Sequence, residues 1–321
     1  MKSHNLHRPV LDKASELSEN TDAILSSSIG CNLDRNTMRS PLLPDRNRQL
    51  NFFICDILDA NPKDDLGSME HPMFTLSTKP DTRIRKYEHN GNTITIIPNV
   101  LGHATILDKD VLIYCISQLV EAVNRKRKDI NRTVRFTAYD LLTVTNRQTD
   151  GDGYRRLKAA LDRLAGTRIK TNIKTRNHRI TDAFGIIDSY RIVEKSPLNG
   201  QMVAIEITLS EWLYNAVLAT EVLTLNRDYF RLRKPLERRL YELARKHCGN
   251  QPQWKIRLEL LHKKTGSSSK LKMFRHHLKA IAQSNHLPDY TVSYCSDDDS
   301  VTFTNRDEQV KARTAIRKLL G

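Results

Sequence analysis

The sequence predicts an α+β fold in which two successive units follow a flexible N-terminal tail. The chain has 321 residues, enough for two ordinary domains, and its hydrophobic content of 39% is sufficient for buried cores. One order of helices and strands can also be assigned twice along the chain. We therefore expect a disordered tail at residues 1–48, a first domain at 49–222 and a second domain at 223–321.

The N-terminal segment differs in composition from the remainder of the chain. Residues 1–48 are rich in Ser, Asn, Asp and Arg and show no sustained hydrophobic period, which predicts a tail without a core of its own. The first dense apolar cluster is NFFICDI at 51–57. The segment HNGNTITIIPN at 89–99 then places β-branched residues after a turn signal, which indicates strands.

The first unit contains helices with recognisable start and stop signals. Asp108 precedes a run in which Leu112, Ile116 and Leu119 recur at helical spacing, and Gly166 is a typical helix stop. The expected elements are a helix within 108–126, a strand at 132–137, a short helix at 138–146, a helix at 154–166, a hairpin with basic arms within 167–195, a strand at 201–210 and a short helix at 211–218.

The second unit repeats this order in a shorter form. Its expected elements are a helix at 234–249, a strand at 253–257, a short helix at 258–266, a longer helix at 267–285 and a hairpin with an acidic tip at 290–305. This is the order of a winged helix, in which the third helix enters the DNA major groove and the hairpin lies along the backbone. The fold class predicted is thus two tandem winged-helix domains, connected near residues 218–233.

The charge of the chain favours a polyanionic partner. The formal net charge is +15, and residues 225–279 alone hold sixteen Lys or Arg against four Asp or Glu. A membrane surface is the competing interpretation, but the longest apolar run, VLIYCI at 111–116, is far too short to span a bilayer, and residues 1–13 contain no apolar signal core. The five cysteines are scattered without a C-x-x-C pair, which predicts a reducing, cytoplasmic location.

The stretch KKTGSSSKLKMFRHHLKAI at 263–281 is the strongest candidate for DNA contact. On a helix, Leu271, Phe274, Leu278 and Ile281 form one apolar stripe, and the opposite side carries cations and donors suited to base edges and phosphates. The three serines are expected to cap the helix and to favour a phosphate. A solvated basic face is the plain alternative. The predicted contact residues here are Lys263, Lys264, Ser269, Lys270, Lys272, Met273, Arg275, His276 and Lys279.

A second, less cationic surface is expected in the first unit. The outward face of its helix at 154–166 carries cations. The arms of the following hairpin carry further cations in positions suited to phosphate contacts. Alternatively, ITDAFGIIDSYRI at 180–192 offers edge strands that pair with a second protomer. The predicted phosphate contacts in this unit are Arg155, Arg156, Lys158, Lys170, Lys174 and Arg176.

Catalytic and metal sites are not indicated by the residue spacing. GSSSK at 266–270 lacks the first glycine and the spacing of a P-loop. His276 and His277 project about 100° apart on a helix, a poor arrangement for one metal ion, and the chain has no H-x-H motif for a nicking enzyme. The three aspartates at 297–299 are most simply a solvated turn. We expect no enzyme activity, no cofactor and no metal.

Several sequence blocks resemble the replication initiator protein A family of bacterial plasmids. The blocks lie at 71–119, 153–172, 207–218 and 230–249, as in GYRRLKAALDRLAGTRIKTN and FRLRKPLERRLYELARKHCG, and the similarity runs from about residue 70 to 305. Residues 1–48 fall outside it. The resemblance assigns the role of recognition helix to the segment after HKKTG, and hence to Lys270, Lys272, Arg275, His276 and Lys279.

The same resemblance implies a function. It implies two winged-helix domains that bind short direct repeats at a plasmid origin, with monomers that initiate replication and dimers, formed through the first unit, that repress the protein's own promoter. It also implies recruitment of the host initiator ATPase and the replicative helicase, without a catalytic step. A tandem winged-helix transcriptional regulator without an initiation role is the alternative, because the DNA-binding features would be the same.

Overall fold

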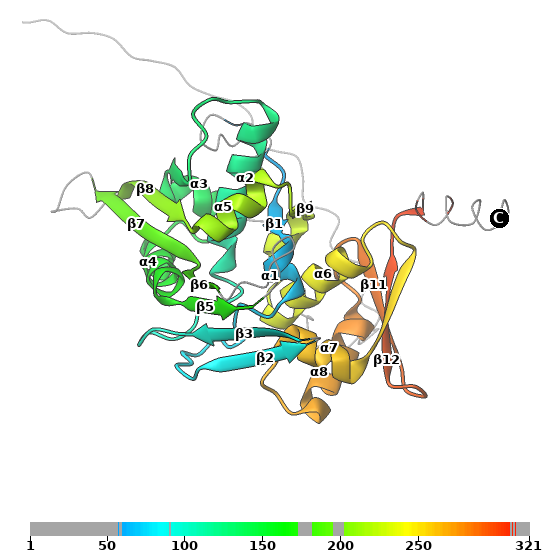
Figure 1. Ribbon diagram of the computed structural model, residues 1–321. Coiled ribbons are helices and arrows are strands. Elements are labelled where there is room, and N and C mark those ends of the chain that lie inside the picture. The colour runs from blue at the N-terminus through cyan, green and yellow to red at the C-terminus, as the bar shows by residue number, and fades with distance from the viewer. Residues whose placement is uncertain are drawn as a thin grey trace, which may run out of the picture. The chain divides into compact units, whose positions relative to one another are not determined.

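A computed structural model describes residues 57, 60–89, 91–172, 182–194, 202–308, 310 and 312, which all belong to one compact unit (Figure 1). The predicted tail, the turn of the basic hairpin and its residues Lys174 and Arg176 lie outside the described residues. Within the described part, helices combine with four sheets of antiparallel strands. The protein is therefore of mixed α and β type.

The predicted elements from residue 108 onward occur in the predicted order, and short elements at 63–70, 222–224 and 227–231 are present in addition. The first half contains β1 (Lys63–Asp65), α1 (Leu66–Glu70), β2 (Arg85–His89), β3 (Asn92–Ile97), α2 (Lys109–Asn124), β4 (Thr133–Phe136), α3 (Ala138–Val144), α4 (Gly151–Gly166), β5 (Arg168–Thr171), β6 (Asp182–Gly185), β7 (Ile187–Glu194), β8 (Met202–Leu209) and α5 (Glu211–Leu218). Helix α4 begins three residues before its predicted start, because the Asp150 side chain accepts a hydrogen bond from the Gly153 backbone N–H (2.9 Å) and caps the helix there.

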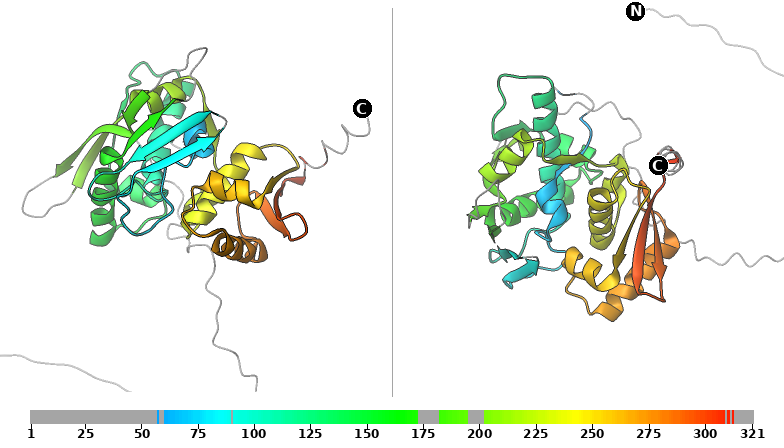
Figure 2. Two further views of the ribbon diagram at one scale, coloured as in Figure 1. Left: turned by 60° about the horizontal axis from the view of Figure 1, so that its bottom comes forward. Right: turned by 45° about the vertical axis from the view of Figure 1, so that its right-hand side comes forward.

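The second half is shorter and contains a similar sheet. Its elements are β9 (Val222–Thr224), the 3-10 helix η1 (Arg227–Arg231), α6 (Pro235–His247), β10 (Gln253–Arg257), α7 (Leu258–Thr265), α8 (Leu271–Ser284), β11 (Tyr290–Cys295) and β12 (Ser300–Asn305). Strands β10, β12 and β11 form one sheet in this order, and α8 packs beside β11 (Figure 2). In the first half β4, β8 and β7 form a sheet of the same order.

The hairpin predicted within 167–195 is confirmed in part: β5 and β6 pair antiparallel, but the second arm does not continue into β7. Strands β5 and β6 join β2 and β3 in a four-stranded sheet of order β2-β3-β5-β6, whereas β7 pairs with β8 in the other sheet. The chain changes sheets at Ile186 and Ile187, which are consecutive and both buried. Two buried neighbours break the in-out alternation of a single strand, so the apolar run marks a crossing and not a continuous arm.

Two hydrophobic cores lie under these sheets, and the chain connects them at more than one place. The larger core surrounds α2, and the smaller one is formed by α6, α7, α8 and the sheet β10-β12-β11. Met69 of α1 and Ile113 of α2 belong to the smaller core. Strand β1 also pairs with β9, with Lys63 opposite Thr224. The segments at 63–70 and 222–224 thus join the two halves.

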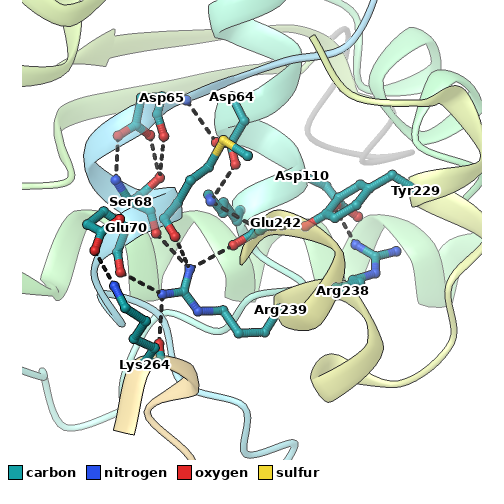
Figure 3. Close-up of polar contacts among 12 residues, drawn as sticks. Asp64, Asp65, Ser68, Glu70, Asp110, Tyr229, Arg238, Arg239, Glu242 and Lys264 are labelled. Carbon is teal, nitrogen blue, oxygen red and sulfur yellow. Dashed lines mark hydrogen bonds and ion pairs between the residues drawn. The ribbon is translucent and has the colours of Figure 1, made fainter. Parts of the chain in front are cut away.

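Buried charges strengthen this junction (Figure 3). The ammonium of Lys109 lies 2.6 Å from Oδ2 of Asp64 and 3.1 Å from Oε1 of Glu242. Each of these three side chains is at most 1% exposed. Arg238 lies 2.5 Å from Asp110, and both are 2% exposed. We call Asp64, Lys109, Asp110, Arg238, Arg239 and Glu242 the junction network.

Arg239 makes the most contacts in the junction network. Its guanidinium donates hydrogen bonds to the carbonyl oxygens of Ser68 (2.9 Å) and Met69 (3.0 Å) at the end of α1 and to that of Lys264 (2.9 Å) in α7, and it lies 3.1 Å from Glu242. The last carbonyls of a helix have no partner within the helix, so Arg239 satisfies acceptors that would otherwise be buried without one. It thereby links α1, α6 and α7.

A histidine at this junction makes stability depend on pH. Burial lowers the pKa of His71 to about 4 from its ordinary value of 6.5. The unfolded chain therefore takes up a proton near pH 6.5 that the folded chain accepts only near pH 4, so stability is complete above pH 6.5 and falls as the pH drops toward 4. We expect the urea midpoint to fall over this range and to fall less in the His71→Gln variant, whereas the exposed His277→Gln should keep the wild-type profile. Identical profiles for all three proteins would contradict this assignment.

Candidate nucleic-acid interface

The turn between α7 and α8 has a geometry that requires glycine. Helix α7 ends at Thr265. The following residue, Gly266, has a left-handed backbone (φ +67°), and its N–H donates to the Lys263 carbonyl (3.1 Å). A Cβ atom at this position would lie 2.5 Å from the side chain of Pro72. Glycine is therefore needed both for the backbone conformation and for the close approach of the 71–72 segment. The predicted glycine turn is confirmed.

Helix α8 begins at Leu271, four residues later than the sequence predicts. Lys270 is extended and makes no side-chain capping bond. The Ser267 and Ser269 hydroxyls lie 2.9 Å apart, and the Ser269 carbonyl lies 2.9 Å from Nε2 of His262 in α7. The prediction that the serines cap α8 is wrong, because they belong to the turn that is fastened to α7.

The two faces of α8 are those that the periodicity predicts. Phe274, Leu278 and Ile281 are at most 2% exposed and pack into the smaller core, and Leu271 packs against it partly buried. The other side is exposed, including 47% of Met273. We call the exposed residues Lys272, Met273, His276 and Lys279 the outer face of α8. Within the described residues, Lys270, Lys272 and His276 form no ion pair.

The hairpin β11–β12 fastens one side of α8. The Arg275 guanidinium donates to both carboxylate oxygens of Asp299 (3.1 and 2.9 Å), and the ammonium of Lys279 lies 4.9 Å from the ring centroid of Tyr294. Arg275 in turn lowers the pKa of the Asp299 carboxyl. The acidic tip is therefore only in part the solvated turn that the sequence predicts, since Asp299 orients an arginine of α8.

This ion pair makes a testable prediction about non-specific DNA binding. Asp299→Asn should release Arg275 to contact a phosphate. We therefore expect the affinity for a random duplex to rise, and the slope of log K against log salt to steepen by about 0.9, the value for one additional phosphate contact. Asp297→Asn, two residues earlier in the same turn, removes the same charge without touching Arg275, so it is the matched control. An equal effect of both variants on the slope would show that only net charge matters.

Two predicted phosphate contacts at the end of α7 lie in different surroundings. Lys263 is 70% exposed and pairs with Glu259 at 3.0 Å on the surface. Lys264 is only 15% exposed and is ion-paired with Glu70, which also lies 3.1 Å from His247. The hydrogen bond from His247, aided by Lys264, lowers the pKa of Glu70. Lys264 therefore holds the junction together, and its prediction as a phosphate contact is not supported by its position.

The predicted contacts of the first half are dispersed. Arg155 and Arg156 are exposed at the start of α4, where both pair with Asp152. Lys158 is exposed one turn further along α4, and Lys170 is exposed on β5, in the four-stranded sheet. The structure thus does not gather them on one helix face. Composition also overstated the basic surface, since Arg238 and Arg239, both counted in the basic segment 225–279, are buried.

Two exposed cations that the sequence did not single out lie in the same sheet as the predicted contact Lys170. Lys86 on β2 and Arg168 on β5 are exposed in the same sheet as Lys170. Only the strand register could have identified them, because Lys86 is more than eighty residues from Lys170 in sequence. Among the described residues, no group of three or more His, Cys, Asp or Glu side chains is placed to hold a metal ion. None of the described helices is both long and apolar enough to cross a membrane.

Comparisons with known proteins define the family. The chain matches the family described as replication initiator protein A over residues 63–292. A protein of Wigglesworthia glossinidia brevipalpis, named putative replication protein, is 44% identical over 257 residues, which cover 79% of this chain and 93% of that protein. The chain therefore belongs to the replication initiator protein A family, as its sequence blocks predict.

A solved structure shares the fold. The crystal structure of domains 2 and 3 of RctB, determined from selenomethionine derivatives, has a TM-score of 0.54 to this chain at 11% sequence identity. The match covers 75% of this chain and 96% of that one. At this level of identity the likeness concerns the arrangement of helices and sheets alone.

Proposed function

We propose that this protein initiates plasmid DNA replication by binding repeated sequences at the origin. The outer face of α8 carries the proposal: a regular amphipathic helix follows a short helix and a tight turn, packs on a sheet, and presents Lys272, His276 and Met273 to solvent. Membership in a family of replication initiators supports the same function. We expect double-stranded DNA as the direct partner.

The proposed architecture is two tandem winged helices. Each half contains a helix, a strand, two further helices and a hairpin, and the first strand pairs with the last in both (β4 with β8, β10 with β12). In the second half, α8 would enter the major groove. Recognition helices on two linked units could occupy grooves about 34 Å apart, one helical turn along the duplex. Arrays of such complexes would bend the origin and strain a neighbouring A·T-rich segment.

The chemistry of the outer face suits base recognition. Lys272 can donate to guanine O6 and N7, His276 can contact a base edge, and Met273 can touch a thymine methyl group. Ser269, Lys270 and Lys263 lie around the start of α8 and are proposed to bind phosphates. Arg275 would act mainly through Asp299, by holding α8 and the hairpin in one arrangement.

The remaining proposals concern partners and regulation. We propose that monomers act at the origin, that a homodimer formed through the first half represses the protein's own promoter, and that the bound complex recruits the host initiator ATPase and replicative helicase. The protein would act in the cytoplasm on DNA, without a catalytic step, cofactor or metal. Metal-dependent cleavage of origin DNA by the pure protein would overturn the last point.

Footprinting on the plasmid's own origin tests this function. Monomer and dimer fractions should be separated and probed at several salt concentrations. We expect monomers to protect direct repeats spaced by about two helical turns, and dimers to protect the promoter. Protection of a lone inverted repeat at the promoter, with no protection at the origin, would instead identify a transcriptional regulator.

A further inference from the structure

The exposed face of the four-stranded sheet is a second cationic surface that α4 and α8 do not account for. The strand register places Lys86 of β2, Thr95 of β3, Lys170 of β5 and Ala183 of β6 in one row across the sheet. The next row on the same face contains Ile97 of β3 and Arg168 of β5. We call Lys86, Arg168 and Lys170 the sheet cations.

The core fixes the direction in which the sheet cations point. Ile94, Ile96 and Ile169 alternate with the exposed positions on β3 and β5 and are at most 2% exposed. Because successive side chains of a strand point to opposite faces, Lys170 and Arg168 must face solvent as long as Ile169 is buried. The orientation of these cations is thus held by the larger hydrophobic core.

The sheet cations are not neutralised by carboxylates of the described chain. None of them forms an ion pair with another described residue, and Arg168 donates a long hydrogen bond to the Ala183 carbonyl (3.4 Å). Glu88, at the end of β2, is the acidic side chain exposed beside Lys86. On α4, by contrast, Arg155 and Arg156 share Asp152. The sheet face is therefore better supplied with unpaired positive charge than the start of α4.

A groove lies between the edge strand β2 and the end of α7. The groove has a volume of about 320 Å³ and is lined by Lys86 and Tyr87 on one side and by Lys263, Gly266 and Ser267 on the other. The Tyr87 hydroxyl donates to the Gly266 carbonyl (3.5 Å), so β2 lies directly beside the turn that precedes α8 (Figure 1). Lys86 belongs both to the sheet face and to the groove.

We propose that the sheet cations bind the sugar-phosphate backbone of duplex DNA next to the segment that α8 reads. The inference rests on the proposed function, since α8 sets where the duplex begins. Lys86 and Lys170 lie two strands apart, about 10 Å, which is about three base-pair rises of 3.4 Å along the duplex axis. Tyr87 is partly buried against the core, and the described face presents no aromatic ring for stacking, which favours a duplex over a single strand.

The test compares two triple variants of equal charge. Lys86→Gln, Arg168→Gln and Lys170→Gln are combined in one protein, and Lys126→Gln, Lys128→Gln and Arg191→Gln, in the loop after α2 and on β7, are combined in the control. Affinity for a random 30-base-pair duplex and for the origin repeats is measured against salt concentration, with hydroxyl-radical footprints on the repeats. Far-UV circular dichroism and urea midpoints establish that both variants fold.

We expect the slope of log K against log salt to become shallower by about 0.9 for each phosphate contact that the sheet variant loses. The sheet variant should also lose protection on one side of the α8 site, whereas the control should keep the wild-type slope and footprint. Equal slopes and footprints for the two variants would overturn the inference. A changed oligomeric state with an unchanged slope would assign the face to a protein partner. If wild-type protein does not prefer the repeats, the proposed function fails, yet the slopes on random duplex still decide the role of the sheet.

Discussion

Replacing Lys109 by methionine is expected to lower the free energy of unfolding by about 3–5 kcal/mol, because removal of one partner leaves buried charge without compensation. The Lys109 ammonium is the cation between Asp64 and Glu242, and all three side chains are excluded from water. Burial alone would lower the pKa of Lys109, but the two carboxylates outweigh it and keep that pKa above its ordinary value. Urea unfolding at neutral pH followed by circular dichroism measures the loss.

The matched control is Lys272→Met, which removes an exposed helical lysine and should change stability by no more than about 0.5 kcal/mol. A double variant with Asp64→Asn should recover part of the loss caused by Lys109→Met, since the uncompensated carboxylate is then absent. If Lys109→Met is as stable as the control, the junction network does not hold the halves together through this lysine.

The second large effect is expected at Arg239. Arg239→Met should lower the free energy of unfolding by about 3–5 kcal/mol. The substitution removes one partner of Glu242, and it leaves buried carbonyl oxygens at the ends of α1 and α7 without a hydrogen-bond donor. The loss should be accompanied by faster amide exchange in α1, a helix of only five residues whose last carbonyls depend on this side chain.

Arg156→Met serves as the control for Arg239→Met, since Arg156 is a largely exposed helical arginine paired with one surface aspartate. Its effect on unfolding should be within about 0.5 kcal/mol. Unchanged exchange in α1 after loss of Arg239 would mean that other contacts satisfy the end of this helix.

Local patterns in the sequence were sufficient to predict most helices and strands from residue 108 onward, and the two faces of α8, but not β1, α1, β9 or η1. The apolar residues of α8 recur at the helical period, so Phe274, Leu278 and Ile281 could be assigned to the core from their spacing alone. The glycine at 266 likewise marked the end of α7. These features depend on neighbours within a few residues, which is the range over which hydrophobic periodicity and capping signals are informative.

Contacts between distant residues could not be predicted in this way. Arg238 pairs with Asp110, 128 positions earlier, and Arg239 bonds to carbonyls about 170 positions earlier, so their burial leaves no periodic signal. Their charges were counted as surface charge for that reason. The passage of the chain from β6 in one sheet to β7 in another was missed because alternation predicts a strand but not its partner.

The claim that the outer face of α8 reads base pairs is tested most directly by binding of Lys272→Ala and His276→Ala to origin repeats in which each base pair is varied in turn, with random duplex measured alongside. We expect each substitution to cost about 1–3 kcal/mol on the intact repeat, little on random duplex, and to relax the preference at one position. Equal losses on repeat and random duplex, with an unchanged base preference, would contradict the claim.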